Sequence, residues 1–151
     1  MNKHSAALIG LGYVGLPLAI LLKRKKIKIF GFDSNNQVIK MIRSGKSYIS
    51  DISNKDIAIL KNEKIYSSKK IKLISKVDYI IICLPTPLKK NKPDMSHIEK
   101  AFKTFLPYLR EGQTIILESS VYPGATKKIF FKILSNRFKL GKNFFLTHSP
   151  E

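Results

Sequence analysis

The sequence has little of what disulfide-bonded, metal-binding and membrane-spanning proteins need. Cys83 is the only cysteine among 151 residues, so no internal disulfide can form, a multi-cysteine metal site is excluded, and we expect no bound metal. A reducing, cytoplasmic setting fits this cysteine usage. No apolar run approaches the roughly 20 residues that cross a bilayer, and residues 1–7 lack the features of a secretory signal. We therefore expect a soluble protein with no membrane partner.

Acidic residues are also scarce. The chain has 10 Asp and Glu against 28 Lys and Arg, which gives a formal net charge of +18. Such a charge favours polyanions, phosphate-bearing small molecules among them. The lysines are scattered along the chain, however, and no nucleic-acid-binding motif accompanies them. We interpret them as solvated surface residues and expect no specific nucleic-acid partner; a basic nucleic-acid binder is the alternative.

Apolar runs and amphipathic segments alternate along the whole chain. Strands are expected at 5–9, 27–33, 64–68, 77–85, 113–120 and 144–149. Helices are expected at 14–25, 34–45, 53–62, 96–109 and 125–138. This alternation predicts an α/β fold, namely a Rossmann-type, doubly wound, mostly parallel sheet with helices on both faces. Residues 1–151 have the length of one domain.

Three of the expected helices begin with capping signals. Ser34 with Gln37 has the spacing of a capping box, and so does Ser96 with Glu99. Ser53 precedes the short third helix and is expected to cap it.

Three glycines follow the first expected strand, in the stretch "LIGLGYVGLP". Gly10, Gly12 and Gly15 form a G-x-G-x-x-G pattern, which is a weak signal alone but gains weight between a strand and a helix. There Gly10 permits a tight turn, Gly12 lets a pyrophosphate approach the backbone, and Gly15 lets helix and strand pack closely. The helix N-terminus offers N–H groups and a positive dipole end to phosphates. The pattern predicts a dinucleotide site; the alternative is a glycine turn that merely joins strand to helix.

A carboxylate stands where such a site needs one. Asp33 ends the second expected strand, 33 − 15 = 18 residues beyond Gly15, close to the roughly 20-residue interval of a carboxylate that binds ribose hydroxyls. Because a carboxylate there repels a 2′-phosphate, the cofactor predicted is NAD rather than NADP. In a doubly wound sheet, ligands bind beyond the carboxyl ends of the strands. The polar stretches "PTP", "ESSVYPG" and "SPE" also follow expected strands, so we expect them at the same edge.

Five ordered motifs carry a resemblance to a known family. They are "GLGYVGLPLA", "GFD", "CLPTPL", "ESSVYPGATK" and "SPE". In this order and at these intervals, the chain resembles the N-terminal NAD-binding domain of the UDP-glucose/GDP-mannose dehydrogenase family over essentially its whole length. The "GLGYVGLP" and "VYPG" forms are most similar to the branch that oxidises UDP-N-acetylhexosamines. The resemblance implies a nucleotide-sugar substrate, whose C6 alcohol is oxidised to a carboxylate by two hydride transfers to NAD through adducts on a catalytic cysteine.

The resemblance also implies roles for individual residues. The residues that seat the dinucleotide and hold its ribose are Gly10, Gly12, Val14, Gly15 and Asp33. Thr86 and Ser120 are implied to lie against the cofactor, and the Ser120 hydroxyl, where the family commonly has threonine, to act through water in proton transfer. Glu151 matches a glutamate assigned acid/base work beside substrate.

Simpler interpretations stay open for several of these positions. Thr86 between two prolines could be a rigid loop residue, and Ser120 could serve the turn that follows it. Glu151 ends the sequence, where side chains often have no role. His97 and His148 have no ligand-like neighbours in sequence, so we interpret both as structural.

The sequence lacks the family's nucleophile. The resemblance places the catalytic cysteine and its lysine, asparagine and aspartate partners in later parts of a longer chain, whereas Cys83 lies inside an expected buried strand, where a thiol is inert. We therefore expect the cofactor half of an enzyme, inactive alone, from a truncated frame, a split enzyme or an incomplete gene model. The alternative is a non-catalytic NAD-binding module. We also expect exposed apolar surface, with self-association into a homo-oligomer or association with the missing domains.

Overall fold

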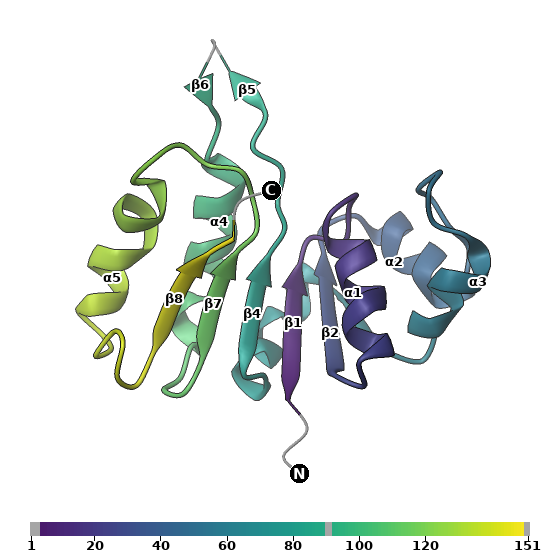
Figure 1. The fold of residues 1–151 in the computed structure, drawn as a ribbon, viewed down its shortest axis with the longest axis horizontal. Coiled ribbons are helices and arrows are strands. Elements are labelled where there is room, and N and C mark those ends of the chain that lie inside the picture. The colour runs from purple at the N-terminus through teal and green to yellow at the C-terminus, as the bar shows by residue number, and fades with distance from the viewer. Residues whose placement is uncertain (1–3, 90–91, 150–151) are drawn as a thin grey trace.

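Six parallel strands form the centre of the molecule in the computed structural model, which describes residues 4–89 and 92–149. The strands are β1 (Ser5–Ile9), β2 (Lys28–Asp33), β3 (Lys64–Ser67), β4 (Tyr79–Ile82), β7 (Thr114–Leu117) and β8 (Phe145–His148). Their order across the sheet is β3-β2-β1-β4-β7-β8, and every neighbouring pair is parallel. The chain thus winds outward from β1 in one direction and from β4 in the other (Figure 1). This topology confirms the predicted doubly wound fold.

Helices cover the two faces of the sheet (Figure 1). They are α1 (Gly15–Arg24), α2 (Asn36–Ser44), α3 (Asn54–Ile57), η1 (Ala58–Leu60), η2 (Ser68–Lys76), α4 (Ser96–Phe105), η3 (Leu106–Tyr108), η4 (Lys127–Phe131) and α5 (Lys132–Ser135). Buried residues of α1 and α2 belong to one apolar cluster, and those of η2, α4, η4 and α5 to the other. A short antiparallel pair, β5 (Leu88–Lys89) and β6 (Lys92–Pro93), projects away from the sheet.

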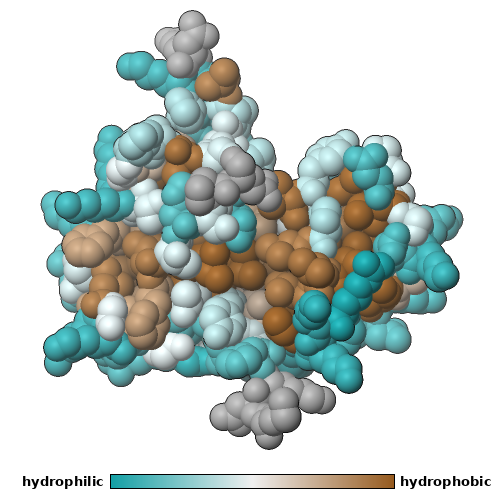
Figure 2. Space-filling model, viewed as in Figure 1, coloured by the Kyte–Doolittle hydropathy of each residue, from teal (hydrophilic) through white to brown (hydrophobic). Residues whose placement is uncertain are grey.

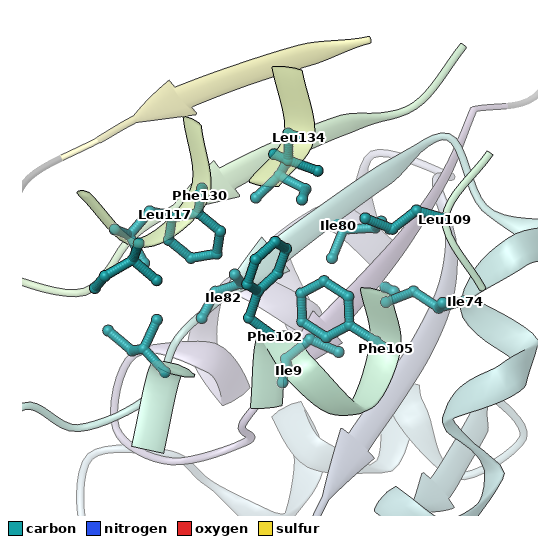
Figure 3. Packing of buried hydrophobic residues seen from close by; sticks show 14 of the residues in the cluster. Ile9, Ile74, Ile80, Ile82, Phe102, Phe105, Leu109, Leu117, Phe130 and Leu134 are labelled. Carbon is teal, nitrogen blue, oxygen red and sulfur yellow. The ribbon is translucent and has the colours of Figure 1, made fainter. Parts of the chain in front are cut away.

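Strand residues alternate between the two clusters. In β4, Ile80 and Ile82 pack on the α4 side, whereas Ile81 packs on the α1 side. Phe102 of α4 lies in the cluster on the α4 side of the sheet, and its ring centroid is 4.6 Å from that of Phe130 (Figure 3). Full burial of such a side chain contributes about 1.5–3 kcal/mol to the stability of the folded state. Apolar packing on both faces thereby fixes the strand ends that carry the candidate site.

Both predicted capping boxes are wrong. The side chain of Asn35, not Ser34, caps α2 by accepting from the Gln37 N–H at 2.9 Å. At α4, the Asp94 carboxylate accepts from the Ser96 N–H at 2.9 Å, and this bond lowers the pKa of Asp94. Asp33, directly before Ser34, likewise accepts from the Asn35 N–H, so at both helices a neighbouring short polar side chain binds a backbone N–H at the helix start.

The Ser53 cap is confirmed, because its hydroxyl accepts from the Asp56 N–H at 3.1 Å. Two helices differ from their expected form. The helix expected at 96–109 continues beyond Phe105 as the 3₁₀ turn η3, which contains Pro107; proline disfavours the helical conformation of the residue before it. The helix expected at 125–138 contains the π-helical turn η4 before α5.

One half of a sheet face carries no helix among the described residues. Over β4, β7 and β8, the face shared with α1 presents the partly exposed side chains Tyr79 and Ile116, and Phe145, which is 44% exposed. Apolar residues lie over these strands in Figure 2. No helix of the described residues could span a membrane.

We expect residues 1–151 to self-associate through this face, because contiguous exposed apolar surface drives association. Light scattering over a concentration series should show a mass that rises with concentration. Phe145→Lys should lower that mass, whereas Leu88→Lys, which changes an exposed leucine on the projecting β5 strand, should not. A wild-type chain that stays monomeric at every concentration would contradict the prediction.

Candidate functional site

Two adjoining hollows lie at the carboxyl ends of the strands, where the winding direction reverses between β1 and β4. Their volumes are about 330 and 360 Å³. They share Gly12 and the segment 83–85 that follows β4. The first hollow opens toward Asp33 at the end of β2 and the second toward Ser120 after β7. This edge is where doubly wound sheets bind their ligands.

A larger cavity, of about 650 Å³, lies at the opposite edge of the sheet. His4, Lys28 and Asp78 contribute to its walls. Asp78 is occupied there by the hydroxyl and N–H of Ser5. None of the predicted site residues lines this cavity, so we place the functional site at the carboxyl edge.

Packing within the protein explains two of the three loop glycines. Gly10 has a φ of +93°, and a Cβ added to it would lie 2.5 Å from the Cys83 carbonyl oxygen. A Cβ on Gly15 would lie 2.0 Å from the Gly10 carbonyl oxygen. Gly12 differs, because no described atom lies within 4 Å of a Cβ added there. The fold requires Gly10 and Gly15, whereas the bare backbone at Gly12 leaves room for something outside the fold.

Gly15→Ala should therefore destabilise the domain. The added methyl collides with the Gly10 carbonyl, and separating α1 from the loop disturbs packing at a cost of about 1–3 kcal/mol. A thermal melt should show the loss, with Gly12→Ala on the same loop as the matched control. Equal melting temperatures for the Gly15→Ala variant and the wild type would contradict the close approach.

Side chains from other elements hold the loop in place. The Leu11 N–H donates to Asp33 Oδ2 at 2.9 Å, and Tyr48 Oη donates to the Leu11 carbonyl. Burial, with a smaller contribution from Asp33, raises the pKa of Tyr48 above its usual range, so the phenol keeps the proton that it donates. Asp33 Oδ1 accepts from the Asn35 N–H at 2.8 Å. The carboxylate is thus fixed against the loop while each oxygen retains acceptor capacity for a ligand hydroxyl.

The helix that follows the loop presents its N-terminus to the same place. Val14 is the N-cap residue of α1 and makes no side-chain cap hydrogen bond. The Leu16 N–H donates to the Gly12 carbonyl at 3.0 Å, which closes the first turn over that glycine. Because the first N–H groups of a helix lack intrahelical partners, this end suits an anion. An acidic side chain is absent from the first turn of α1.

The second hollow is built by tying the loop after β4 to the loop after β7. Thr86 Oγ1 donates to the Ser120 carbonyl at 2.7 Å. The buried Ser119 hydroxyl accepts from the Leu84 N–H at 3.0 Å and donates to the Leu84 carbonyl at 2.6 Å. These bonds set the spacing of the walls, so that Thr86, Glu118 and Ser120 all line one space.

Comparison with known proteins agrees with this geometry. Residues 4–151 match the NAD binding domain of the UDP-glucose/GDP-mannose dehydrogenase family. The chain belongs to that family. Protein CapL from Staphylococcus aureus is 37% identical over 154 residues, which cover 100% of this chain and 35% of that protein. UDP-N-acetyl-D-mannosamine dehydrogenase from Pyrococcus horikoshii is 34% identical, covering 96% of this chain and 35% of that protein.

Solved structures of family members share the fold. The UDP-D-ManNAc dehydrogenase of Pyrococcus horikoshii superposes with a TM-score of 0.85 and 32% identity over 97% of this chain and 36% of that one. The UDP-N-acetyl-mannosamine dehydrogenase Cap5O of S. aureus gives a TM-score of 0.84 at 28% identity over 97% of this chain and 36% of that one. The chain thus spans about a third of the length of these relatives. The matching family model is that of an NAD binding domain, which confirms the cofactor predicted from the glycine pattern together with Asp33.

The fold brings almost all of the predicted site residues of this family member together. Those that line or frame the two hollows are Gly10, Gly12, Val14, Gly15, Asp33, Thr86 and Ser120. Glu151 lies outside the described residues. Cys83, expected inside a strand, directly follows β4, is 7% exposed and lines both hollows. The individual roles of the predicted site residues toward NAD remain predictions.

Sequence reasoning missed three residues of the site. Tyr48 and Ser119 hold its loops, and His97, interpreted from the sequence as structural, lines the first hollow. Ser119 lies within the quoted motif "ESSVYPGATK", next to Ser120. The motif therefore indicated a serine at this place, but not that Ser119 is the one that binds the Leu84 backbone. Tyr48 and His97 carry no signal in the sequence, because each meets the site through the fold.

Proposed function

We propose that NAD lies extended across the carboxyl edge of the sheet. The observation that carries this proposal is the open backbone at Gly12, beside the N-terminus of α1, where a pyrophosphate would pack. Asp33, in the first hollow, would bind the adenosine ribose hydroxyls. The nicotinamide would then reach the second hollow, whose walls include Thr86 and Ser120.

We further propose that the domain serves the oxidation of the C6 alcohol of a UDP-N-acetylhexosamine to the uronate. Relatives named UDP-N-acetyl-D-mannosamine dehydrogenase and UDP-N-acetyl-D-glucosamine 6-dehydrogenase support this substrate class. NAD supplies the hydride acceptor when bound. Thr86 and Ser120 would position the reacting end, the Ser120 hydroxyl passing a proton through water, and Glu151 would do acid/base work beside the sugar.

Enzyme assays test the substrate class. The polypeptide that carries this domain should form NADH with UDP-N-acetylmannosamine or UDP-N-acetylglucosamine, two NADH for each sugar. UDP-glucose and GDP-mannose should support less turnover. Preference for UDP-glucose or GDP-mannose would refute the proposed branch, while the NAD site would stand.

Residues 1–151 alone should produce no NADH. Cys83 is the only cysteine, and it lies buried at the end of β4, where its thiol cannot serve as the covalent nucleophile of this family. Activity that appears only on mixing with a polypeptide covering the rest of a relative would indicate a split enzyme. Formation of NADH by residues 1–151 alone would refute the expectation that activity needs a cysteine outside them. NAD binding with no activity, either alone or in the mixture, would favour a non-catalytic module.

We also propose a cytoplasmic location and no specific nucleic-acid partner. The single buried cysteine fits a reducing compartment. Any DNA binding should disappear between low and physiological salt, because scattered lysines supply only non-specific charge attraction.

A further inference from the structure

His97 lines the first hollow together with Asp33. It is the second residue of α4, and its side chain is exposed. The same hollow is lined by Ser68 and Ile71 of η2 and by Leu84. Two aromatic side chains belong to the described lining, Phe32 and His97. Phe32 is only 1% exposed and packs in the core, so His97 supplies the flat ring that a ligand can reach.

The start of α4 does not depend on this imidazole. The Asp94 carboxylate, rather than the imidazole, accepts from the Ser96 N–H at the helix start. Ile98, Phe102 and Phe105 anchor the helix in the core, each at most 1% exposed. The position of His97 at the hollow is therefore set by the helix, and its exposed side chain, which also acts by charge on the Asp94 carboxylate, can reach a ligand.

The geometry of a dinucleotide directs its base to this ring. With the pyrophosphate over Gly12 and the ribose at Asp33, the base must extend beyond Asp33, away from the second hollow. Among the walls of the first hollow that the second does not share, Ile71 is apolar and His97 is aromatic. A purine binds most readily in such a slot, because its flat apolar faces stack on rings.

We propose that His97 stacks on the adenine ring of NAD and so contributes to binding of the adenosine half of the cofactor. This inference rests on the proposed placement of NAD. It assigns a binding role to a residue whose sequence neighbours indicated none.

The test compares His97→Ala, His97→Phe and the wild type, all as residues 1–151. His4→Ala is the matched control, because His4 is also exposed but lies in the cavity at the opposite edge of the sheet. Affinities for NAD and AMP are measured by calorimetry, and binding of nicotinamide mononucleotide by ligand-observed NMR. Thermal melts show whether each variant is folded.

His97→Ala should bind NAD and AMP about tenfold more weakly, with nicotinamide mononucleotide unchanged. His97→Phe should regain most of the affinity, because it restores a flat ring, and His4→Ala should match the wild type. Wild-type affinity of His97→Ala for AMP would overturn the inference, and so would a phenylalanine variant as weak as alanine or an equal loss for the mononucleotide. A wild-type chain that binds neither NAD nor AMP would overturn the proposed function itself, and this inference with it.

Discussion

Gly12→Ala is expected to lower the affinity for NAD by about a hundredfold without weakening the fold. The added methyl meets no described atom within 4 Å, so it collides only with a ligand that approaches the backbone. We expect alanine there to raise the free energy of unfolding slightly, by about 0.4–1 kcal/mol, because replacing glycine restricts the unfolded chain. Calorimetric titration with NAD and a thermal melt measure the two effects separately.

The comparison with Gly15→Ala makes this result specific. Gly15→Ala should lose stability through its clash with the Gly10 carbonyl, whereas Gly12→Ala should lose only binding. The two substitutions are chemically identical and lie in one loop. A Gly12→Ala variant that binds NAD as the wild type does would show that no ligand packs against this backbone.

Asp33→Ala is expected to lose most of the affinity for NAD. The change removes the acceptors proposed for the ribose hydroxyls and also releases the Leu11 and Asn35 N–H groups that the carboxylate binds at 2.9 and 2.8 Å. Truncating a charged hydrogen-bonding partner costs about 1.5–3 kcal/mol for each bond to the ligand. The loss for NADP should be smaller, because the carboxylate that repels the 2′-phosphate is gone.

Parallel titrations of the wild type, Asp33→Ala and Asp33→Asn with NAD and NADP measure the change in preference. Asp33→Asn removes the charge but keeps one acceptor oxygen, enough for one of the two N–H groups of Leu11 and Asn35, so it helps to separate loop support from charge repulsion. Asp51→Ala, at an exposed position remote in sequence from the motifs, is the control. An Asp33→Ala variant that still prefers NAD as strongly as the wild type would contradict the assigned role.

The features that sequence predicted well are those with local causes. Apolar runs gave the strands, because both faces of a doubly wound sheet are buried. The positions of Gly10, Gly12 and Asp33 could be predicted from spacing. The two glycines lie in one turn, and only one helix and one strand separate that turn from Asp33. The capping boxes failed for an equally local reason, because the Asn35 side chain accepts from the Gln37 N–H and the Asp94 carboxylate accepts from the Ser96 N–H.

Other site residues could not be predicted, because the fold brings them together from distant parts of the chain. The Tyr48 hydroxyl meets the Leu11 carbonyl across 37 residues of sequence, and Ser119 meets Leu84 across 35. His97 reaches the first hollow only because α4 packs behind β4. Periodicity reports which face of an element is buried, but it does not report which distant loop that element meets.

Calorimetric titration of residues 1–151 with NAD and NADP, side by side, tests the central claim most directly. Because Asp33 offers hydroxyl acceptors and repels a 2′-phosphate, NAD should bind at least about tenfold more tightly than NADP, a difference of about 1.4 kcal/mol. A folded chain that binds neither nucleotide, or that binds NADP as tightly as NAD, would contradict the account.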